Sequence, residues 1–156
     1  MDETQIIKQL KEGNEVAFKN MVDTFQEKVL NTSLGFVPSL HDAEDIVQEV
    51  FLEVFRSINK FRGDSKLSTW IYRISLNCCL TLLKKKKNNT QHFASDYLPP
   101  ELVEDSHAFE DESLNQLYDA IRQLSEIDRG VIMLYLEEKP YQEIAEIIGT
   151  NPNNIG

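Results

Sequence analysis

Basic and aromatic side chains are closely spaced in residues 60–77, which read KFRGDSKLSTWIYRISLN. Cations at this density can hold the phosphates of a nucleic acid, and flat aromatic rings can stack on its unpaired bases. Phe61 and Trp70 are the candidate stacking rings, although Trp70 precedes Ile71, an expected core residue, and fits the core equally well. The candidate phosphate-binding cations are Lys60, Arg62, Lys66 and Arg73. The segment therefore suggests a polyanionic partner such as DNA or RNA.

Four consecutive lysines, Lys84–Lys87, extend the basic region about two helical turns further along the chain. We expect these side chains to contact the phosphates of duplex DNA. The alternative is a solvated helix end, where cations balance the negative end of the helix dipole.

Carboxylates line one face of residues 42–54, which read DAEDIVQEVFLEV. Four of them recur at about one-turn spacing: Asp42, Asp45, Glu49 and Glu53. The opposite face is apolar, so the pattern predicts an amphipathic helix, and no Lys or Arg precedes Arg56 within it. The acidic face could dock on a basic macromolecule, whereas an ordinary solvated face is the alternative.

The sequence contains no arrangement of residues typical of catalysis or metal binding. Cys78 and Cys79 are adjacent, which disfavours a disulfide between them, and the three His are scattered. The carboxylates lie on the acidic face or in a flexible segment, without a Gly-rich phosphate loop or a nucleophile motif. We therefore predict no enzyme activity, no metal site and no cofactor.

The net charge of −10 conceals two oppositely charged regions. Residues 56–87 carry nine basic side chains and one acidic, whereas residues 96–128 carry ten acidic and one basic. This asymmetry favours a basic nucleic-acid face and a separate acidic segment. No apolar run approaches roughly 18 residues, and the amino terminus lacks a signal-peptide pattern, so we expect a cytoplasmic protein without direct membrane insertion.

Helical periodicity recurs along the sequence, and the strict alternation of strands is absent, which predicts an all-α fold. The first predicted helices cover residues 3–11, 14–33, 40–58 and 65–87, with Asn14 capping the second. They should form one bundle within residues 1–87. The basic helix should bury Leu67, Ile71, Ile74, Cys78 and Leu82.

Residues 88–112 interrupt the helical pattern with paired prolines, Pro99 and Pro100, and many acidic side chains, and predict a flexible linker. Fully extended, roughly 25 residues span about 80 Å, so the flanking domains need not touch. The acidic linker could instead fold back over the basic face in the free protein.

Residues 113–156 predict a second, smaller helical domain. Ser125 should cap one of its helices, and residues 141–156, YQEIAEIIGTNPNNIG, have the spacing of a helix-turn-helix. Ala145 would let the two helices approach and Gly149 would allow the left-handed turn, although such spacing also occurs in ordinary helical hairpins. We expect this sequence to be truncated within the second helix, so that most base-reading positions are missing.

Three segments in this order resemble the extracytoplasmic-function (ECF) group of sigma-70-type RNA polymerase sigma factors: DAEDIVQEVF, FRGDSKLSTWIYRISLN and QLSEIDRGVIMLYLEEKPYQEIAEIIG. The resemblance implies a four-helix domain like sigma region 2 in residues 1–87 and a helix-turn-helix domain like sigma region 4 in residues 113–156. The chain departs from the family at Thr81 and Lys85, where Asp and Arg are frequent, and at Ser125, where Pro is common.

The resemblance implies a transcription initiation factor that binds core RNA polymerase and recognises and melts the −10 element of promoter DNA. In the family the acidic helix docks on a coiled coil of the largest polymerase subunit, which here implies Asp42, Asp45, Gln48, Glu49 and Leu52. The implied −10 residues are Lys60, Phe61, Arg62, Ser65, Lys66, Trp70, Arg73, Asn77, Lys84 and Lys85. The implied helix-turn-helix contacts to the −35 element are Tyr141, Gln142, Thr150, Asn151, Asn153 and Asn154. An anti-sigma factor is a further implied partner.

The residues alone are also compatible with two other functions. A stand-alone helix-turn-helix regulator, with a ligand-sensing amino-terminal domain, would bind duplex DNA without polymerase. A structural adaptor would carry the basic and aromatic segment by accident.

Overall fold

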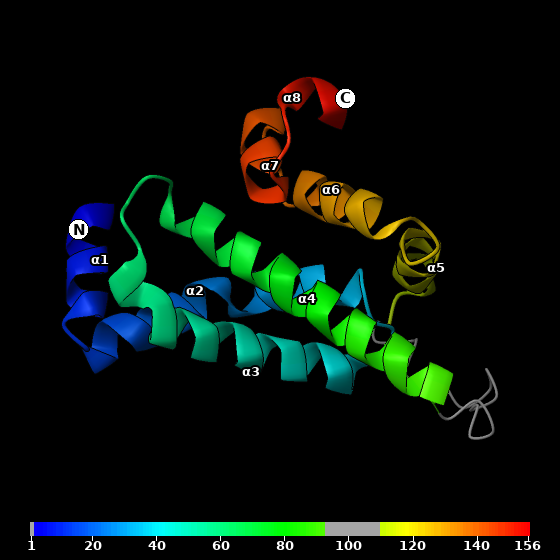
Figure 1. Cartoon of the computed structure of the whole chain (residues 1–156), viewed down its shortest axis with the longest axis horizontal. Helices are drawn as coiled ribbons and strands as arrows, with labels where there is room; N and C mark the ends of the chain where they lie inside the picture. The colour runs from blue at the N-terminus through cyan, green and yellow to red at the C-terminus, as the bar shows by residue number, and fades with distance from the viewer. Residues whose placement is uncertain (1, 93–109) are drawn as a thin grey trace.

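The computed structural model describes the backbone of residues 2–92 and 110–156, and the side chains of residues 2–85 and 110–156. Every regular element in these ranges is a helix, which confirms the predicted all-α fold (Figure 1). The elements are α1 Glu3–Lys11, α2 Glu15–Leu34, α3 Leu40–Ser57, the 3-10 turn η1 Ile58–Lys60, α4 Leu67–His92, α5 Glu112–Ile121, α6 Glu126–Leu136, α7 Tyr141–Ile148 and α8 Pro152–Ile155.

Side-chain caps begin most of these helices. The Asn14 side chain accepts a hydrogen bond from the Ala17 amide at 3.0 Å, and the Ser125 hydroxyl accepts one from the Asp128 amide at 3.3 Å. Each cap satisfies an amide that the first helical turn leaves unpaired. Both predicted helix starts are confirmed, and equivalent caps come from Asp2, Ser39, Asp111 and Asn151.

Helix α4 is longer than the sequence pattern predicts. It continues to His92, past the predicted end at Lys87. Residues 88–92, NNTQH, contain neither Gly nor Pro, so nothing in them interrupts the backbone hydrogen bonds. The predicted linker, residues 88–112, therefore begins as helix and ends at the start of α5, and its residues 93–109 lie outside the described part of the chain.

Helices α1 to α4 pack around one apolar core. Helix α3 lies along both α2 and α4, and α1 contacts α2 and η1. The apolar stripe predicted for α3 is buried: Ala43, Ile46, Val47, Val50, Phe51 and Val54. The opposite, charged face of α3 is consequently left toward solvent.

Helix α4 buries a second face that the predicted apolar stripe did not include. Tyr72, Leu76 and Cys79 are between 0 and 6% exposed. By contrast, the predicted Ile74 and Cys78 are only partly buried. The reason is that α4 lies between two layers, with α2 and α3 on one side and α7 on the other (Figure 1).

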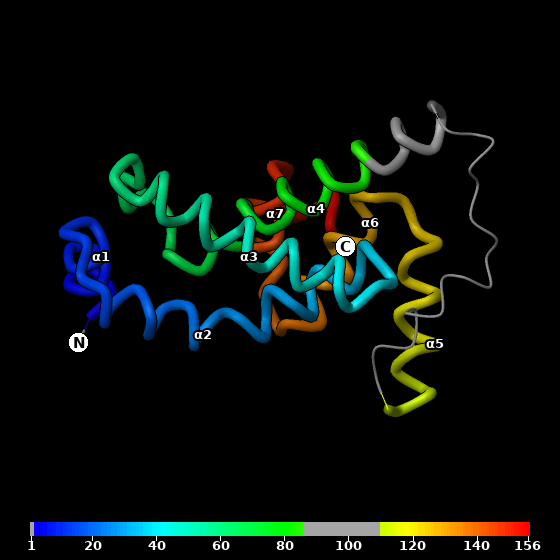
Figure 2. Tube along the Cα trace, turned by 90° about the horizontal axis from the view of Figure 1, so that it is seen from below, coloured from blue at the N-terminus to red at the C-terminus, as the bar shows by residue number. Residues whose placement is uncertain are grey.

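The carboxyl-terminal module, α5–α8, lies against α4 and α2, on the side of α4 away from α3 (Figure 1). Met133 and Leu134 of α6 and Ile144 of α7 belong to the same buried cluster as the core of α1–α4. Figure 2 shows α1 and α5 at opposite ends of the molecule. The two modules, which the sequence left free to separate, are thus packed together. None of the described helices combines the length and apolar composition needed to cross a membrane.

Candidate nucleic-acid and protein interfaces

The loop between η1 and α4 is held in place by α1. Lys11 Nζ donates a hydrogen bond to the Phe61 carbonyl oxygen at 2.6 Å, and Glu3 Oε1 accepts one from the Leu67 amide at 3.2 Å. Gly63, at a φ of 80°, supplies the left-handed residue of this loop. Hydrogen bonds from α1 therefore hold both ends of the loop that carries Arg62.

Phe61 and Trp70 stack on each other, with ring centroids 4.9 Å apart and an interplanar angle of 25°. Phe61 is only 5% exposed and belongs to the core. This corrects the prediction that Phe61 is a platform for a base, because its ring is already covered by protein. Trp70 is half-buried and is the ring of the pair that a base could reach.

The other residues expected to bind the −10 strand form one strip. Lys60, Arg62 and Lys66 are exposed on η1 and the loop, with Ser65 half-buried between them. Trp70, Arg73 and Asn77 then follow on α4 at spacings of three and four residues, which place them on a single helical face. The structure therefore brings Trp70, Arg73 and Asn77 together on one face of α4.

Two cations of this strip already have partners in α7. Lys66 Nζ lies 2.6 Å from Glu143 Oε1, and Arg73 Nη2 donates to the Glu146 carbonyl oxygen at 2.6 Å. The hydrogen bond and charge of Glu143 raise the pKa of Lys66, so this ammonium stays charged. The strip and the carboxyl-terminal module are therefore directly linked by charge.

Lys84 and Lys85 are exposed near the far end of the same helix. Lys85 also lines a shallow groove between α3 and α4, together with Asn77, Asp45 and Glu49. The side chains of the last two lysines of the run lie outside the described residues. Lys85 therefore lies across this groove from acidic side chains of α3.

The residues expected to dock on polymerase lie along α3. Asp45, Gln48 and Glu49 are exposed, Asp42 is half-buried, and Leu52 is 48% exposed. These side chains lie on the face of α3 opposite its buried apolar residues. The structure therefore presents them as one surface.

Two side chains lie close to carboxylates of this surface. His41 Nε2 lies 3.6 Å from Asp45 Oδ2, and Arg56 Nη1 lies 3.6 Å from Glu49 Oε1 and 3.9 Å from Glu53 Oε2. Such solvent-exposed pairs contribute about 1 kcal/mol or less, because water screens them. A basic partner could therefore displace them at little cost.

Phe55 belongs beside this surface but was missed by the sequence analysis. Its ring is 62% exposed and contacts Phe18 edge-on, with centroids 5.7 Å apart. Phe55, Leu52 and Gln48 line a cavity of about 720 Å³ between α2 and α3. The signal was present in the sequence, since Leu52 and Phe55 are large apolar residues outside the buried stripe of an amphipathic helix.

Helices α7 and α8 contact each other across a short turn, at the position where the sequence predicts a helix-turn-helix. Gly149 ends α7 with φ 91° and ψ 37°, and Asn151 caps α8. Ala145, the expected small contact residue, is 2% exposed. The predicted DNA-contacting residues are all exposed: Tyr141, Gln142, Thr150, Asn151, Asn153 and Asn154.

Cys79 is buried in the bundle, whereas Cys78 is partly buried and lines the groove between α3 and α4. Burial raises the pKa of Cys78 to about 11 and that of Cys79 to about 12, so both are protonated at neutral pH. Among the residues that the structure describes, no cluster of three or more His, Cys, Asp or Glu could hold a metal ion.

Known families match both modules. Residues 21–89 match Sigma-70 region 2, and residues 114–156 match Sigma-70, region 4. The ECF RNA polymerase sigma factor SigW of Bacillus subtilis (strain 168) is 31% identical over 159 residues, covering 91% of this chain and 82% of that protein. The ECF RNA polymerase sigma-E factor of Escherichia coli (strain K12) is 31% identical over 155 residues, covering 92% and 81%.

Solved structures share the fold. CnrH in complex with the cytosolic domain of CnrY superposes with a TM-score of 0.68 at 18% identity, over 98% of this chain and 86% of that chain. An engineered region 2 of sigmaE in complex with GTAAAA gives a TM-score of 0.53 at 30% identity, over 57% of this chain and 93% of that chain. With both sigma regions matched in order and relatives above 30% identity along most of their length, this chain belongs to the ECF group of sigma-70 RNA polymerase sigma factors, non-enzymatic subunits that bind core polymerase and promoter DNA and direct transcription initiation.

Proposed function

We propose that α3 is the surface through which this sigma factor docks on the coiled coil of the largest polymerase subunit. Asp45, Gln48 and Glu49 supply a negative, hydrogen-bonding surface, and Leu52 and Phe55 supply apolar contacts beside it. Aromatic residues at the centre of an interface usually contribute more than exposed charges at its rim. The charges should therefore orient the partner, while Phe55 and Leu52 hold it.

The strip from Lys60 to Asn77 is proposed to hold the melted −10 strand. Extruding a base from the duplex costs a few kcal/mol, and stacking on an aromatic ring returns about 1–3 kcal/mol per base. Trp70 is the residue suited to this, with Arg62 and Arg73 as phosphate contacts. Support comes from the engineered region 2 of sigmaE, 30% identical, whose structure was solved with GTAAAA.

Two further DNA contacts complete the proposal. Lys84 and Lys85 contact duplex phosphates upstream of the melted region, because they lie on α4 beyond Asn77. The helix-turn-helix contacts the −35 element through Tyr141, Gln142 and the exposed residues around α8. Together these contacts span both promoter elements.

An anti-sigma partner and a cytoplasmic location are also proposed. The support is the shared fold with CnrH, which was solved in complex with the cytosolic domain of CnrY. Such a partner would compete with polymerase for the exposed surface of α3.

The exposed acidic and apolar face of α3 is the observation that carries the docking proposal. Reversing two charges, Asp45→Lys with Glu49→Lys, should lower affinity for core polymerase at least tenfold in a labelled-chain titration, because complementary charges become repulsive. The matched control, Asp23→Lys with Glu27→Lys, makes the same change at the same spacing on α2 and should stay within threefold. Equal losses in both variants would contradict docking through α3. Tight duplex binding without polymerase would instead favour a stand-alone regulator.

A further inference from the structure

Helix α1 supplies a polar contact at each end of the loop between η1 and α4. Where the loop begins, Lys11 Nζ donates to the Phe61 carbonyl oxygen at 2.6 Å. Where the loop ends, Glu3 Oε1 accepts from the Leu67 amide at 3.2 Å. Because Glu3 and Lys11 are separated by about 12 Å of helix, at 1.5 Å per residue, one short helix spans the whole loop.

Glu3 supplies the capping acceptor that the residues directly before α4 do not provide. The caps of α2, α3 and α6 come from the residue directly before each helix. At α4 that residue is Lys66, whose ammonium only donates hydrogen bonds. The Ser65 hydroxyl donates to the Lys66 carbonyl at 3.3 Å. The Leu67 amide, which the first helical turn leaves unpaired, therefore bonds to a carboxylate of another helix.

The backbone that α1 holds is the backbone that carries the two stacked rings. Lys11 binds the carbonyl of Phe61 itself. Trp70 lies in the first turn of α4, and its amide donates to the Lys66 carbonyl at 3.2 Å. The two rings stack with centroids 4.9 Å apart. The bonds from α1 therefore hold the loop and the helix start between which this stack forms.

Helix α1 is itself firmly anchored in the bundle. Leu10 is 6% exposed, and Ile6 and Ile7 pack against the core cluster. The Asp2 side chain caps the first turn of the helix, and Gly13, at a φ of 79°, follows its end. Helix α1 is therefore a fixed support for the loop.

Glu3 also places a negative charge beside the proposed −10 strip. The pKa of Lys66 is raised mainly by Glu143 and to a smaller extent by the charge of Glu3. A carboxylate near a phosphate contact opposes the binding of a nucleic acid. Electrostatics alone therefore predict tighter DNA binding when Glu3 is removed, whereas a role in holding the loop predicts weaker binding.

We propose that Glu3 and Lys11 are positioning residues for the −10 strand, which hold the loop before α4 in the conformation that receives the strand. The proposal rests on the proposed function, which assigns the strip from Lys60 to Asn77 to that strand. The two side chains bind protein backbone and not the strand. When either bond is lost, the apparent affinity for the strand falls with the fraction of chains whose loop stays competent.

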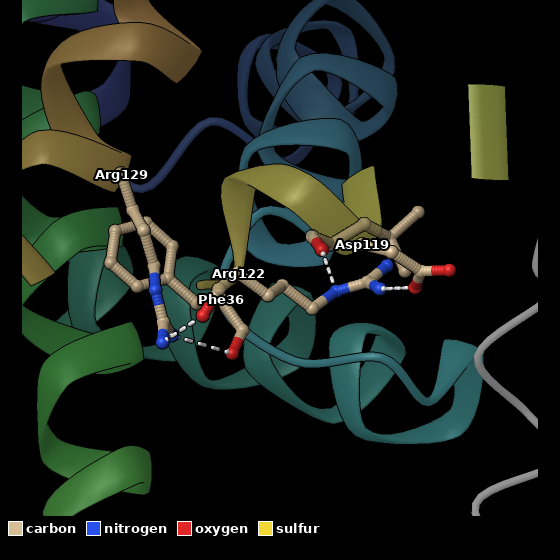
Figure 3. Close-up of polar contacts among 5 residues, drawn as sticks. Phe36, Asp119, Arg122 and Arg129 are labelled. Atoms are coloured by element: carbon tan, nitrogen blue, oxygen red, sulfur yellow. Dashed lines mark hydrogen bonds and ion pairs between the residues drawn. The ribbon is translucent and has the colours of Figure 1, made fainter. Parts of the chain in front are cut away.

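The contacts that hold the carboxyl-terminal module do not involve α1 (Figure 3). Arg122 Nε donates to the Leu34 carbonyl at 2.9 Å, and Arg129 Nη1 donates to the Phe36 carbonyl at 3.3 Å. Both carbonyls lie at the end of α2, and α1 lies at the opposite end of the molecule from α5 (Figure 2). Substitutions in α1 leave these bonds in place, so their effect on DNA binding reports on the loop.

The test compares the full chain with variants of α1 in binding a labelled single-stranded oligonucleotide of mixed sequence, followed by fluorescence anisotropy at low salt. Glu3→Ala removes the acceptor for the Leu67 amide. Its matched control, Glu12→Ala, removes the same charge from the same helix, beside the same cavity of about 550 Å³ between α1 and the loop. Lys11→Met removes the donor and keeps an unbranched apolar side chain, and Lys8→Met, beside the same cavity, is its control.

Affinity should fall about three- to tenfold in Glu3→Ala and in Lys11→Met, the range expected for one hydrogen bond that favours the competent loop. Glu12→Ala should bind equally or slightly more tightly, and Lys8→Met should stay within about twofold. Glu3→Gln keeps an acceptor and Lys11→Arg keeps a charged donor, so both should recover most of the affinity.

Trp70 provides a second measurement, because it is the only tryptophan in the chain. Loss of either bond should loosen its stack with Phe61. Its emission should then shift to longer wavelength, and acrylamide should quench it more strongly, in Glu3→Ala and Lys11→Met than in the two controls. A purely stabilising role would lower the urea midpoint without changing Trp70 emission in the folded chain.

Unchanged or tighter DNA binding by Glu3→Ala, with unchanged Trp70 emission, would overturn the positioning role of Glu3. Equal losses in Lys11→Met and Lys8→Met would overturn that of Lys11 and leave only an effect of charge. Circular dichroism shows which variants are folded, and if one Ala or Met variant is not, the other carries the test.

Failure of the proposed function gives a different result. The oligonucleotide would then leave Trp70 emission of the unaltered chain unchanged, and Trp70→Ala would bind it equally well. That outcome would place the DNA site elsewhere and overturn both proposals. A response of Trp70 to the oligonucleotide, without any effect of the α1 variants, would overturn the positioning role alone.

Discussion

At the scale of single residues, the stacked pair Phe61 and Trp70 separates two roles that look the same in the sequence. Both rings are flanked by cations, so either could receive a base. The structure buries Phe61 and leaves part of Trp70 open. Sequence pattern could not assign these roles, because the exposure of each ring depends on how α1 holds the loop before α4.

Replacing each ring by Ala should therefore have different effects. Trp70→Ala should weaken single-strand binding roughly five- to hundredfold, the value of one base–aromatic stack, and Trp70→Tyr should recover much of it. Phe61→Ala should instead lower the free energy of unfolding by about 3–5 kcal/mol, as expected for a buried ring. Anisotropy and urea denaturation measure the two effects. Equal stability losses in both Ala variants, with unchanged DNA affinity in Trp70→Ala, would assign Trp70 to the core alone.

The raised pKa values of the two cysteines predict slow alkylation of the native chain. Thiolates, not thiols, react with iodoacetamide, and burial raises the pKa of Cys78 to about 11 and of Cys79 to about 12. At pH 8 alkylation of the native chain should be roughly two hundredfold slower at Cys78 and roughly two thousandfold slower at Cys79 than in urea, where a free thiol has a pKa near 8.5. Mass spectrometry over time measures this. Rapid labelling of Cys79 in the native state would show that the bundle opens around α4.

At the scale of helices, local chemistry explains what the sequence predicted. The predicted helix starts at Asn14 and Ser125 are confirmed, because a capping side chain bonds only to an amide in the first turn of its own helix. The end of α4 at His92 and its second buried face at Tyr72 and Leu76 were not predicted. Both depend on the layer that packs against α4, which no single window of sequence contains.

The far end of α4 carries the predicted duplex contact. Replacing Lys84 and Lys85 by Gln should reduce the salt dependence of promoter binding by the polymerase complex. The expected decrease is about 0.9 in log–log slope for each duplex phosphate that the variant no longer neutralises. Lys8→Gln with Lys19→Gln removes two exposed charges from α1 and α2 and is the control. If the Lys84 and Lys85 variant shows the same salt dependence as the unaltered chain, these lysines form a solvated helix end and do not contact duplex phosphates.

At the scale of the whole molecule, oppositely charged surfaces of the two modules lie against each other. The basic strip of α4 faces the acidic helix α7, and the acidic face of α3 points to solvent. The sequence showed this asymmetry, and suggested that acidic residues could cover the basic face. It placed them in residues 88–112, whereas the described contact comes from Glu143 and the end of α7. Which acidic segment reaches the basic face depends on the docking of two modules far apart in sequence.

The most direct test of the central claim is reconstituted transcription of fragmented DNA from the organism that carries this gene, with its core polymerase and sequencing of transcript 5′ ends. With this chain added, transcripts should begin at defined positions that share −35 and −10 sequences. Core polymerase alone, or with the Asp45→Lys and Glu49→Lys variant, should lack these starts. The same scattered starts with and without the chain would contradict its function as a sigma factor.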